Sequence, residues 1–390
     1  MKQYLCLLLV LALLLTGCGN KNAQITPTEP VETQPTTPAE ETIIESITEP
    51  VSQYSQVPMV AVSMPIQTET TVADDKTILS SYSYQTLQLV LNDPDIAERI
   101  ILSHLNRLEK NHKSAAAVSS QAESAYRIGS NWTSYFYEAA YFPTRIDTAV
   151  LSIFNKNVQY TGGNHPYTQC AAANYNMQTG EVLTLGSILT NVNAKDALCS
   201  VLIQNTSTIA EDKQLYEEYP QIITDRFKRD ESYDEDWFFS SSGLCFFFAP
   251  YEIAPYISGI VVIEIPYKQL DGIIHSSFMP NYEDFGKGNI LVINEKEIEF
   301  DNFSQIAEVN MATQGTSAFI FTDGLIYDVE ISVTNGGTVF RASTLSPGDG
   351  ILLTADFRDT QQFSVTYRSG AEVITQILSF NETTLAFSLA

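Results

Sequence analysis

The sequence predicts an α+β protein, in which helices pack on one face of a mostly antiparallel sheet and a smaller all-β, sandwich-like domain follows. Apolar residues have helical spacing in only two regions, near residues 96–108 and 193–219. Short apolar runs separated by Gly, Asn and Asp turns occupy most of the rest. Strands, a helix and further strands in that order are typical of an α+β layer. With 390 residues and 44% hydrophobic residues, the chain can bury more than one core.

The α+β domain is expected over residues 77–288 and begins with alternating residues at 82–90 that predict a strand. Asn92-Asp93-Pro94 is a helix-start signal, and the apolar residues after it predict a helix to about His112. That helix is expected to bury Ile96, Ile100, Ile101, Leu105 and Leu108. Strands are expected at 134–141, 148–154 and 170–176, a helix within 193–219, and central strands at 243–249 and 259–265.

The all-β domain is expected over residues 289–390, where helical spacing is absent. Asp323-Gly324, between the apolar runs 319–322 and 325–327, is the strongest hairpin signal of the chain. Turn residues recur at 335–337, 347–350 and 369–370, an interval typical of β-sandwiches. This region contains no cluster of His, Cys or carboxylate side chains that would indicate chemistry.

The first 17 residues are predicted to be a signal peptide, because the apolar run 5–15 is shorter than the roughly 20 residues that a spanning helix needs. Leu15-Thr16-Gly17-Cys18 resembles a bacterial lipobox, which predicts lipidation of Cys18 and a location outside the cell, anchored at the outer face of the cytoplasmic membrane. The alternative is an ordinary secretion signal with an incidental cysteine. Residues 18–76 are rich in Thr, Pro and Glu and predict a disordered tether, with the apolar segment 57–62 interpreted as linker.

The charge balance argues against nucleic-acid partners. The chain has 21 Lys and Arg against 46 Asp and Glu, a formal net charge of -25. Binding to nucleic acid needs a basic face that can release counterions, which this composition does not provide. A basic protein or another cationic surface is therefore the expected kind of partner.

Catalytic and metal motifs are missing from the sequence, so neither a cofactor nor a metal is expected. There is no His-Glu-x-x-His, no Gly-x-Ser-x-Gly, no phosphate loop and no dinucleotide fingerprint. Cys170, Cys199 and Cys245 lack metal-ligand spacing and can form at most one disulfide, and small buried core residues are the favoured interpretation. The acidic run Asp234-Glu235-Asp236 is interpreted as a solvated turn rather than a glycosidase pair.

Two aromatic turns are the candidate ligand-binding segments. Residues 160–167 join two predicted strands through a double glycine followed by a histidine, and residues 250–256 carry two Pro-Tyr pairs that hold phenol rings on a stiff backbone. Rigid tyrosines provide contact area at low entropic cost. The alternatives are a tight loop with a hydrogen-bonded histidine, and tyrosines that close the end of the core. The predicted ligand-binding residues are Tyr160, Thr161, Gly162, Gly163, His165, Tyr167, Tyr251, Glu252, Pro255 and Tyr256.

Four motifs in order carry a family resemblance over about residues 78–280. They are residues 160–165, residues 174–176 with 179–180 and 183–186, residues 237–248, and residues 250–256 with Gly259. On these motifs the chain resembles the extracellular domain family of RsiV-type anti-sigma factors and of the non-catalytic region of PdaC-type cell-wall deacetylases. The resemblance implies an α+β domain at the cell surface, and its best-understood member binds lysozyme. The sequence contains no deacetylase metal motif, and residues after 289 do not take part in the resemblance.

The predicted function is that of a lipid-anchored, non-enzymatic surface protein that recognises a cell-wall-associated ligand. That ligand is expected to be a lysozyme-like muramidase, another basic cell-wall protein or a glycan. One alternative is a hydrolase of cell-wall polymer that uses His165 with a nearby carboxylate for acid–base catalysis. The other is a structural adhesin in which the all-β domain engages the partner.

Overall fold

A computed structural model of the chain describes residues 59–228, 235–280, 287–294, 304–312, 315–333, 337–355, 362–381 and 386–389. The predicted signal peptide, Cys18 and the tether as far as residue 58 lie outside the described residues, as does Asp234. Residues 52–390 cluster into one compact unit. None of the helices in the described part is long and apolar enough to cross a membrane.

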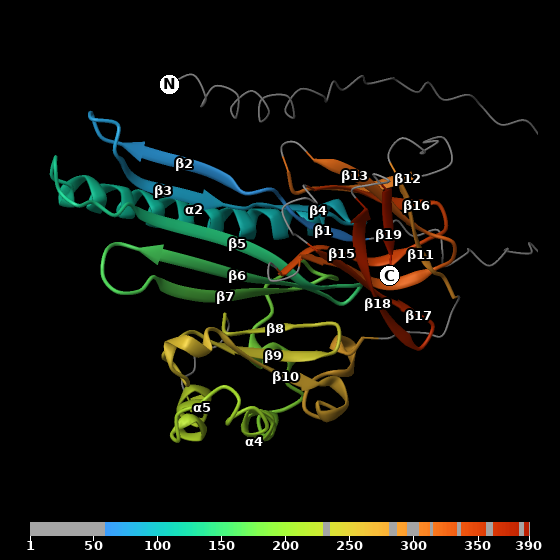
Figure 1. Ribbon diagram of the computed structural model, residues 1–390. Helices are drawn as coiled ribbons and strands as arrows, with labels where there is room; N and C mark the ends of the chain where they lie inside the picture. The colour runs from blue at the N-terminus through green and yellow to red at the C-terminus, as the bar shows by residue number, and fades with distance from the viewer. Residues whose placement is uncertain are drawn as a thin grey trace, which may run out of the picture. The chain divides into compact units, whose positions relative to one another are not determined.

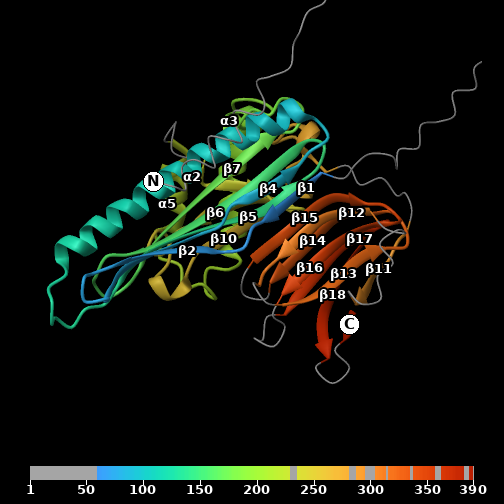
Figure 2. The same ribbon diagram turned by 90° about the horizontal axis from the view of Figure 1, so that it is seen from above.

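The larger sheet of the α+β part has five strands and is covered by one long helix (Figure 1). Its strand order is β2 (Gln67–Val72), β3 (Ile78–Tyr84), β5 (Tyr135–Ile146), β6 (Val150–Tyr160) and β7 (Tyr167–Asn176). All neighbours are antiparallel except β3 and β5. A parallel pair needs a crossover, and helix α2 (Pro94–Ala125) provides it. Figure 2 shows α2 lying along the length of this sheet.

Helix α2 begins where the sequence predicts and ends later. The Asp93 side chain caps it by accepting from the backbone N–H groups of Asp95 and Ile96. Beyond His112 its buried positions are small residues, Ala115, Val118 and Ala122, which continue the contact face without large apolar side chains. The helical spacing of large apolar residues therefore ends before the helix itself ends.

The buried face of α2 differs from the predicted one. Ile96 and Ile100 are buried as expected, but His104 and Asn111 follow them on that face. Ile101 and Leu105 are exposed instead, the latter by 50%. A polar network accounts for the shift, because Asn111 donates to the Tyr141 hydroxyl at 2.7 Å and accepts from the Tyr137 hydroxyl at 3.1 Å.

A three-stranded sheet packs beneath the five-stranded one. Its order is β10 (Val261–Pro266), β9 (Gly243–Phe248) and β8 (Trp237–Phe239), so β10 is an edge strand rather than a central one. Alternate residues of β9 serve two cores. Cys245 and Phe247 pack with Phe154 and Ala172 of the larger sheet. Leu244, Phe246 and Phe248 face the opposite core, shared with α4 (Ala194–Ser207) and α5 (Tyr219–Lys228).

The region expected to form one helix within 193–219 contains the shorter helix α4, and α5 begins only at Tyr219. Side chains near the end of α4 bond to preceding carbonyls, with Thr206 Oγ1 donating to Leu202 O and Thr208 Oγ1 to Asn205 O, both at 2.7 Å. Pro220 lies in the first turn of α5, the position that proline favours. The α3 helix (Leu185–Ile188) precedes them, with a Thr184–Ser187 capping box.

The all-β part consists of two sheets around a common apolar core. The four-stranded sheet contains β11 (Ile290–Asn294), β13 (Thr316–Thr322), β16 (Asp349–Ala355) and β12 (Ser304–Asn310), in that order. The seven-stranded sheet has the order β19 (Ala386–Leu389), β18 (Glu372–Asn381), β17 (Phe363–Ser369), β14 (Ile326–Val333), β15 (Gly337–Leu345), β1 (Val60–Ser63) and β4 (Leu87–Val90). An α+β fold with a sandwich-like β part is confirmed at this level.

Strands β1, β2 and β4 correct the predicted boundaries. The segment expected to be tether contains β1 and β2, and β1 is buried at all four positions between β15 and β4. The apolar segment 57–62 was interpreted as linker, but its residues 60–62 are a central strand, because the sandwich core supplies the burial that the local sequence lacks. The all-β part therefore includes residues from before position 289.

The predicted Asp323-Gly324 hairpin is also wrong. Strand β13 pairs with β11 and β16, whereas β14 pairs with β15 and β17, so this turn passes from one sheet to the other. Asp323 Oδ1 accepts from the Asn289 N–H at 2.6 Å. Gly324 packs directly on Gly288, and a Cβ on Gly288 would lie 2.5 Å from the Gly324 carbonyl oxygen. The Asp-Gly pair serves this close backbone crossing.

Candidate functional site

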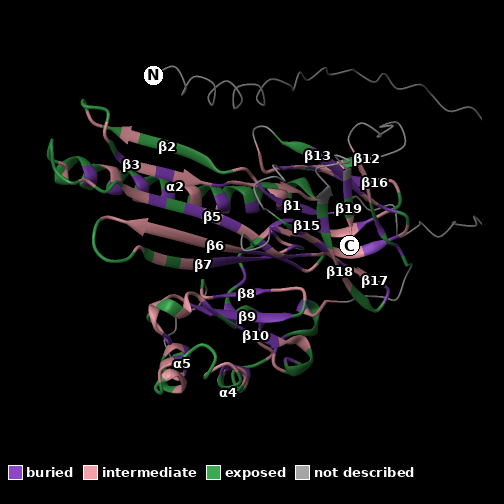
Figure 3. Ribbon diagram, viewed as in Figure 1, coloured by how far each residue is buried: buried purple, intermediate pink, exposed green. Residues whose placement is uncertain are grey.

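The turn between β6 and β7 presents His165 at the surface. Gly162 and Gly163 have φ values of 93° and 107°, which only glycine adopts without strain. The Tyr160 hydroxyl donates to the Gly163 carbonyl at 3.2 Å and fixes the turn from its first strand. Residues 162–165 are all exposed, as the green loop between β6 and β7 in Figure 3 shows.

The second turn follows β9 and is anchored by its middle. Ile253 and Ala254 are buried in the core shared with α4 and α5, and the Tyr251 N–H donates to the Ala254 carbonyl at 3.1 Å. Tyr251 has a φ of 73°, a strained value for a non-glycine residue, and it is 57% exposed. Pro255 precedes the short helix η2 (Tyr256–Ser258), which starts with Tyr256.

The two turns meet through their aromatic rings. The His165 ring stacks on the Tyr256 ring, with centroids 4.7 Å apart and planes 25° apart. The Tyr256 ring in turn contacts Tyr251, with centroids 5.5 Å apart and planes at 35°. We call these three residues the aromatic stack. His165 therefore forms one surface feature with two tyrosines that follow it by 86 and 91 positions in the sequence.

Exposed residues border the stack along the chain. Ile257, directly after Tyr256, is 86% exposed, and Tyr167, the first residue of β7, is 61% exposed. Flat rings with a negative face and a polar edge, beside exposed aliphatic surface, can bind apolar or cationic groups of a partner. Such a surface offers contact area without an enclosed cavity.

Glu252 holds the second turn in place, while its predicted part in ligand binding stays a prediction. Its Oε2 accepts from the Ala249 N–H at 2.6 Å, and its Oε1 accepts from Arg226 Nη2. Arg226 also lies 3.5 Å from the Asp236 carboxylate and 4.8 Å above the Phe248 ring. Both carboxylate oxygens of Glu252 are thus engaged in holding the turn.

Asp236 is half-buried beside this ion pair and is not part of a fully solvated turn. Burial raises the pKa of its carboxyl to about 6, although the Arg226 guanidinium acts in the opposite direction. Its side chain remains 27% exposed. The Asp236 carboxyl, next to the ion pair that holds the second turn, therefore gains a proton as the pH falls through 6.

Tyr160, Thr161 and Gly162 lie apart from the aromatic stack. Tyr160 pairs across the strands with Phe136 and stacks on it at 5.7 Å. Thr161 is half-buried, and a Cβ on Gly162 would lie 3.3 Å from the Tyr135 hydroxyl. These residues shape the β6–β7 turn from the side of β5. Pro255 is also half-buried and positions Tyr256 through η2.

The alternative enzyme role would need an acid–base partner for His165. Among the described residues, the His165 ring contacts the Tyr256 ring, and neither a hydrogen bond nor an ion pair joins His165 to an Asp or Glu. No group of three His, Cys, Asp or Glu in the described ranges could hold a metal ion. The three described cysteines are free thiols, and burial raises the pKa of Cys170 to about 12.

Sequence reasoning missed two contributors to this surface. Arg226 holds Glu252 from α5, and nothing in its local sequence indicates that contact. Ile257 could have been found, because an apolar residue directly after two Pro-Tyr pairs has no core period to explain it. The pairing of His165 with Tyr256 could not be deduced from spacing, since it depends on how β7 and the second turn pack.

Comparisons with known proteins identify the class of one region. Residues 188–268, which include α4, α5, the three-stranded sheet and the second turn, match the family model described as "Protein of unknown function (DUF3298)". This region is therefore similar to the DUF3298 family, and the match is compatible with the RsiV/PdaC-type resemblance.

Solved structures of DUF3298 proteins are similar to this chain. A member of the DUF3298 family from Bacteroides fragilis shares 18% identity, with a TM-score of 0.38, over 56% of this chain and 94% of its own. A DUF3298 family protein from Pseudomonas aeruginosa shares 15% identity, also with a TM-score of 0.38, over 56% of this chain and 97% of its own. No curated protein matches the sequence.

Proposed function

We propose that the chain is a lipid-anchored, non-enzymatic protein of the outer cell surface that binds a cell-wall-associated protein through the aromatic stack. The observation that carries the proposal is the stacking of His165 on Tyr256, together with the tilted contact of Tyr256 with Tyr251. Aromatic residues exposed on a rigid scaffold are typical anchors of protein interfaces. The lipobox-like segment ending at Cys18 supports the membrane anchor.

The partner is a basic protein, and a lysozyme-like muramidase is the specific candidate. A net charge of -25 would attract a basic protein and raise its association rate, an effect that salt weakens. The RsiV/PdaC-type resemblance supplies lysozyme as the candidate. The rings of the aromatic stack can also receive Arg and Lys side chains of such a partner.

Binding of a basic lysozyme to the full-length chain tests the proposal. Tyr256→Ala removes the central ring, and Ile257→Ala removes exposed aliphatic surface beside it; at an interface centre each is expected to weaken binding about tenfold or more. Val192→Ala is the matched control, because Val192 is 87% exposed in the same region that matches DUF3298, in the loop before α4. Isothermal titration calorimetry at low and physiological ionic strength measures the affinities.

The outcomes separate the partner from the surface. Saturable, salt-sensitive binding that is lost in Tyr256→Ala and kept in Val192→Ala supports both. Absence of saturable binding at low ionic strength removes lysozyme as the partner. Equal affinities for Tyr256→Ala and Val192→Ala remove the aromatic stack from the contact.

A further inference from the structure

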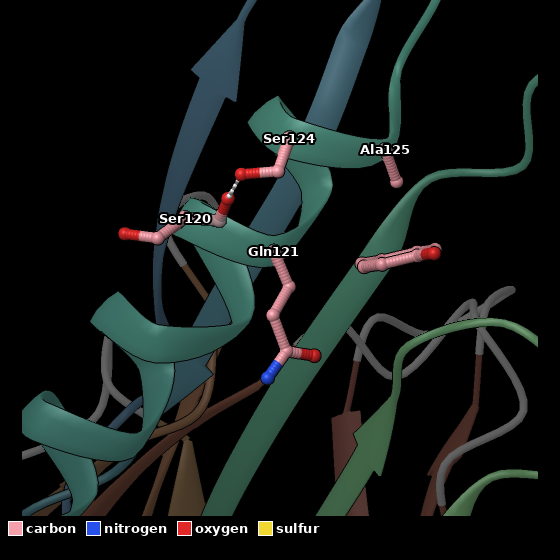
Figure 4. Close-up of a pocket in the computed structure, with 5 residues that line it drawn as sticks. Ser120, Gln121, Ser124 and Ala125 are labelled. Carbon is pink, nitrogen blue, oxygen red and sulfur yellow. Dashed lines mark hydrogen bonds between the residues drawn. The ribbon is translucent and has the colours of Figure 1, made fainter.

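A shallow pocket lies at the C-terminal end of α2, and none of the three residues of the aromatic stack lines it. Four residues of the last turns of α2 and the first residue of β5 line it: Ser120, Gln121, Ser124, Ala125 and Tyr135. Figure 4 shows the side chain of Gln121 extending from the helix toward the neighbouring strand, with its amide at the end. None of the lining residues carries a charge at neutral pH, in a chain that is otherwise strongly acidic.

One aromatic ring, that of Tyr135, lines this pocket, and further rings pack around it. The Tyr135 ring stacks on Trp132, with centroids 5.0 Å apart and planes 30° apart. Tyr126 meets Trp132 edge-on at 5.5 Å, and Tyr160 meets Tyr135 edge-on at 6.2 Å. The residues come from the end of α2, the loop after it, β5 and β6, so the cluster is built by tertiary packing.

Hydrogen bonds hold these rings in place. The Trp132 indole N–H donates to the Ile78 carbonyl at 3.2 Å, and the Tyr126 hydroxyl donates to Asp75 Oδ2 at 2.6 Å. Both acceptors lie at the β2–β3 end of the sheet. A ring that is fixed before binding loses less conformational entropy when a ligand arrives.

The polar side of the pocket has groups ready to bond a ligand. Ser124 Oγ donates to the Ser120 carbonyl at 2.8 Å and keeps its own lone pairs as acceptors. The Gln121 amide has both donors and acceptors, and no partner for it is found among the described residues. The exposed Gln121 amide beside the Tyr135 ring combines directional bonds with a flat apolar surface.

We propose that this pocket binds a pyranose ring of an uncharged saccharide. The axial C–H groups of such a ring are weakly positive and fit the negative face of an aromatic ring, and its equatorial hydroxyls reach amide and hydroxyl partners at the edge. A nucleotide has flat rings as well, but its phosphates would be repelled by the acidic chain. The proposal concerns a site separate from the aromatic stack and does not depend on the proposed function.

Tryptophan fluorescence provides a direct test. The chain has two tryptophans, and Trp237 is fully buried whereas Trp132 is half-buried beside the pocket wall. In full-length Trp237→Phe, emission comes from Trp132 alone. Titration with chitotriose is expected to change that emission saturably, and cellotriose in a parallel titration shows whether the N-acetyl groups of cell-wall amino sugars are needed.

Substitutions decide whether the response comes from the pocket. Gln121→Ala removes the amide from an exposed helix position, and loss of its bonds is expected to lower affinity about tenfold in calorimetric titrations. Asn106→Ala is the matched control, because Asn106 is an exposed amide on the same helix at a distance from the pocket. Circular dichroism confirms that both variants are folded.

The possible results are distinct from those of the lysozyme test. Saturable binding of either trisaccharide that weakens in Gln121→Ala and not in Asn106→Ala supports the site. Absence of binding up to about 10 mM of both sugars, an affinity below any useful level, overturns it. Binding that is equal in the two variants overturns it as well, whatever the behaviour of Tyr256→Ala toward lysozyme.

Discussion

Strain at Tyr251 gives a prediction in which stability and binding separate. The residue has a φ of 73° and is 57% exposed, so the fold tolerates an unfavourable backbone for a side chain that it does not bury. We compare Tyr251→Gly with Tyr251→Ala. Both remove the ring, but glycine adopts this backbone freely whereas alanine does not.

The magnitude follows from three contributions. The left-handed conformation costs a non-glycine residue about 1–2 kcal/mol, and glycine loses about 0.5–1 kcal/mol more than alanine in backbone entropy on folding. The Gly variant is therefore expected to be about 0.7 kcal/mol more stable than the Ala variant. Loss of the contact with Tyr256 lowers the free energy of unfolding of both variants equally, by about 0.5 kcal/mol at an exposed site.

Urea unfolding followed by tryptophan emission measures the difference. Trp237 is fully buried in the core that also holds Ile253 and Ala254 of the same turn, so its emission reports unfolding of the relevant part. We expect Tyr251→Gly to unfold at a higher urea concentration than Tyr251→Ala, with an unchanged slope. Lysozyme binding should be weakened in both variants.

Two results would refute this reasoning. If Tyr251→Ala is as stable as Tyr251→Gly, the backbone at residue 251 is not strained in solution. If Tyr251→Gly keeps full affinity for the partner, the ring is not a contact. A stable Gly variant without binding would show that the tyrosine is retained for recognition at a cost in stability.

Three further predictions concern the framework. Burial, with a smaller contribution from Arg107, lowers the pKa of His104 from 6.5 to about 4, so the fold favours the neutral ring. The stabilisation that this gives is fully present above pH 6.5, and the free energy of unfolding falls by up to about 3 kcal/mol as the pH drops to 4. His104→Leu should remove that slope relative to the wild-type chain in urea unfolding at each pH, and an unchanged slope would contradict it. Arg145→Met removes bonds to Asp147, the Tyr267 hydroxyl and the Phe278 carbonyl, and should cost about 3 kcal/mol or more in thermal unfolding; a cost below 1 kcal/mol would be too small for a buried charge of this kind. Gly243→Ala places a Cβ 2.3 Å from the Ile265 carbonyl oxygen and should destabilise by about 2 kcal/mol or more, whereas Gly186→Ala, with no atom closer than 4.0 Å, should be nearly neutral; equal melting temperatures would contradict the clash.

Local pattern predicted the elements of the fold better than their partners. The start of α2 and the strands β5, β6, β7 and β9 follow from capping, alternation and apolar runs. The Asp323-Gly324 turn shows the limit, because its sequence fits a hairpin while its strands join different sheets. Strand pairing depends on which core a strand completes, and that information lies far away in the chain.

The candidate site shows the same division. Double glycines and Pro-Tyr pairs predicted two stiff turns, and the structure places both at the surface. Their contact through His165 and Tyr256 required tertiary structure. The contact of Glu252 with Arg226 could not be predicted either, because a carboxylate in a turn gives no sign of a partner on a helix that precedes it by many residues. Their roles in ligand binding stay predictions.

The composition of the seven-stranded sheet determines how the competing functions can be separated. Val60, Ala61 and Val62 pair with Ala342, Arg341 and Phe340, and all three are buried. Removal of residues 289–390 would expose both valines, whose burial stabilises by about 1.5–3 kcal/mol each, and would leave β1 without its neighbour β15. Loss of ligand capture after such a deletion would therefore not distinguish an adhesin role of the all-β part from damage to β1 and the segment that leads into β2. Single substitutions at exposed positions, such as Ile257→Ala, leave the apolar cores of the sandwich and of the α+β part intact. Only such substitutions can assign binding to the surface around the aromatic stack.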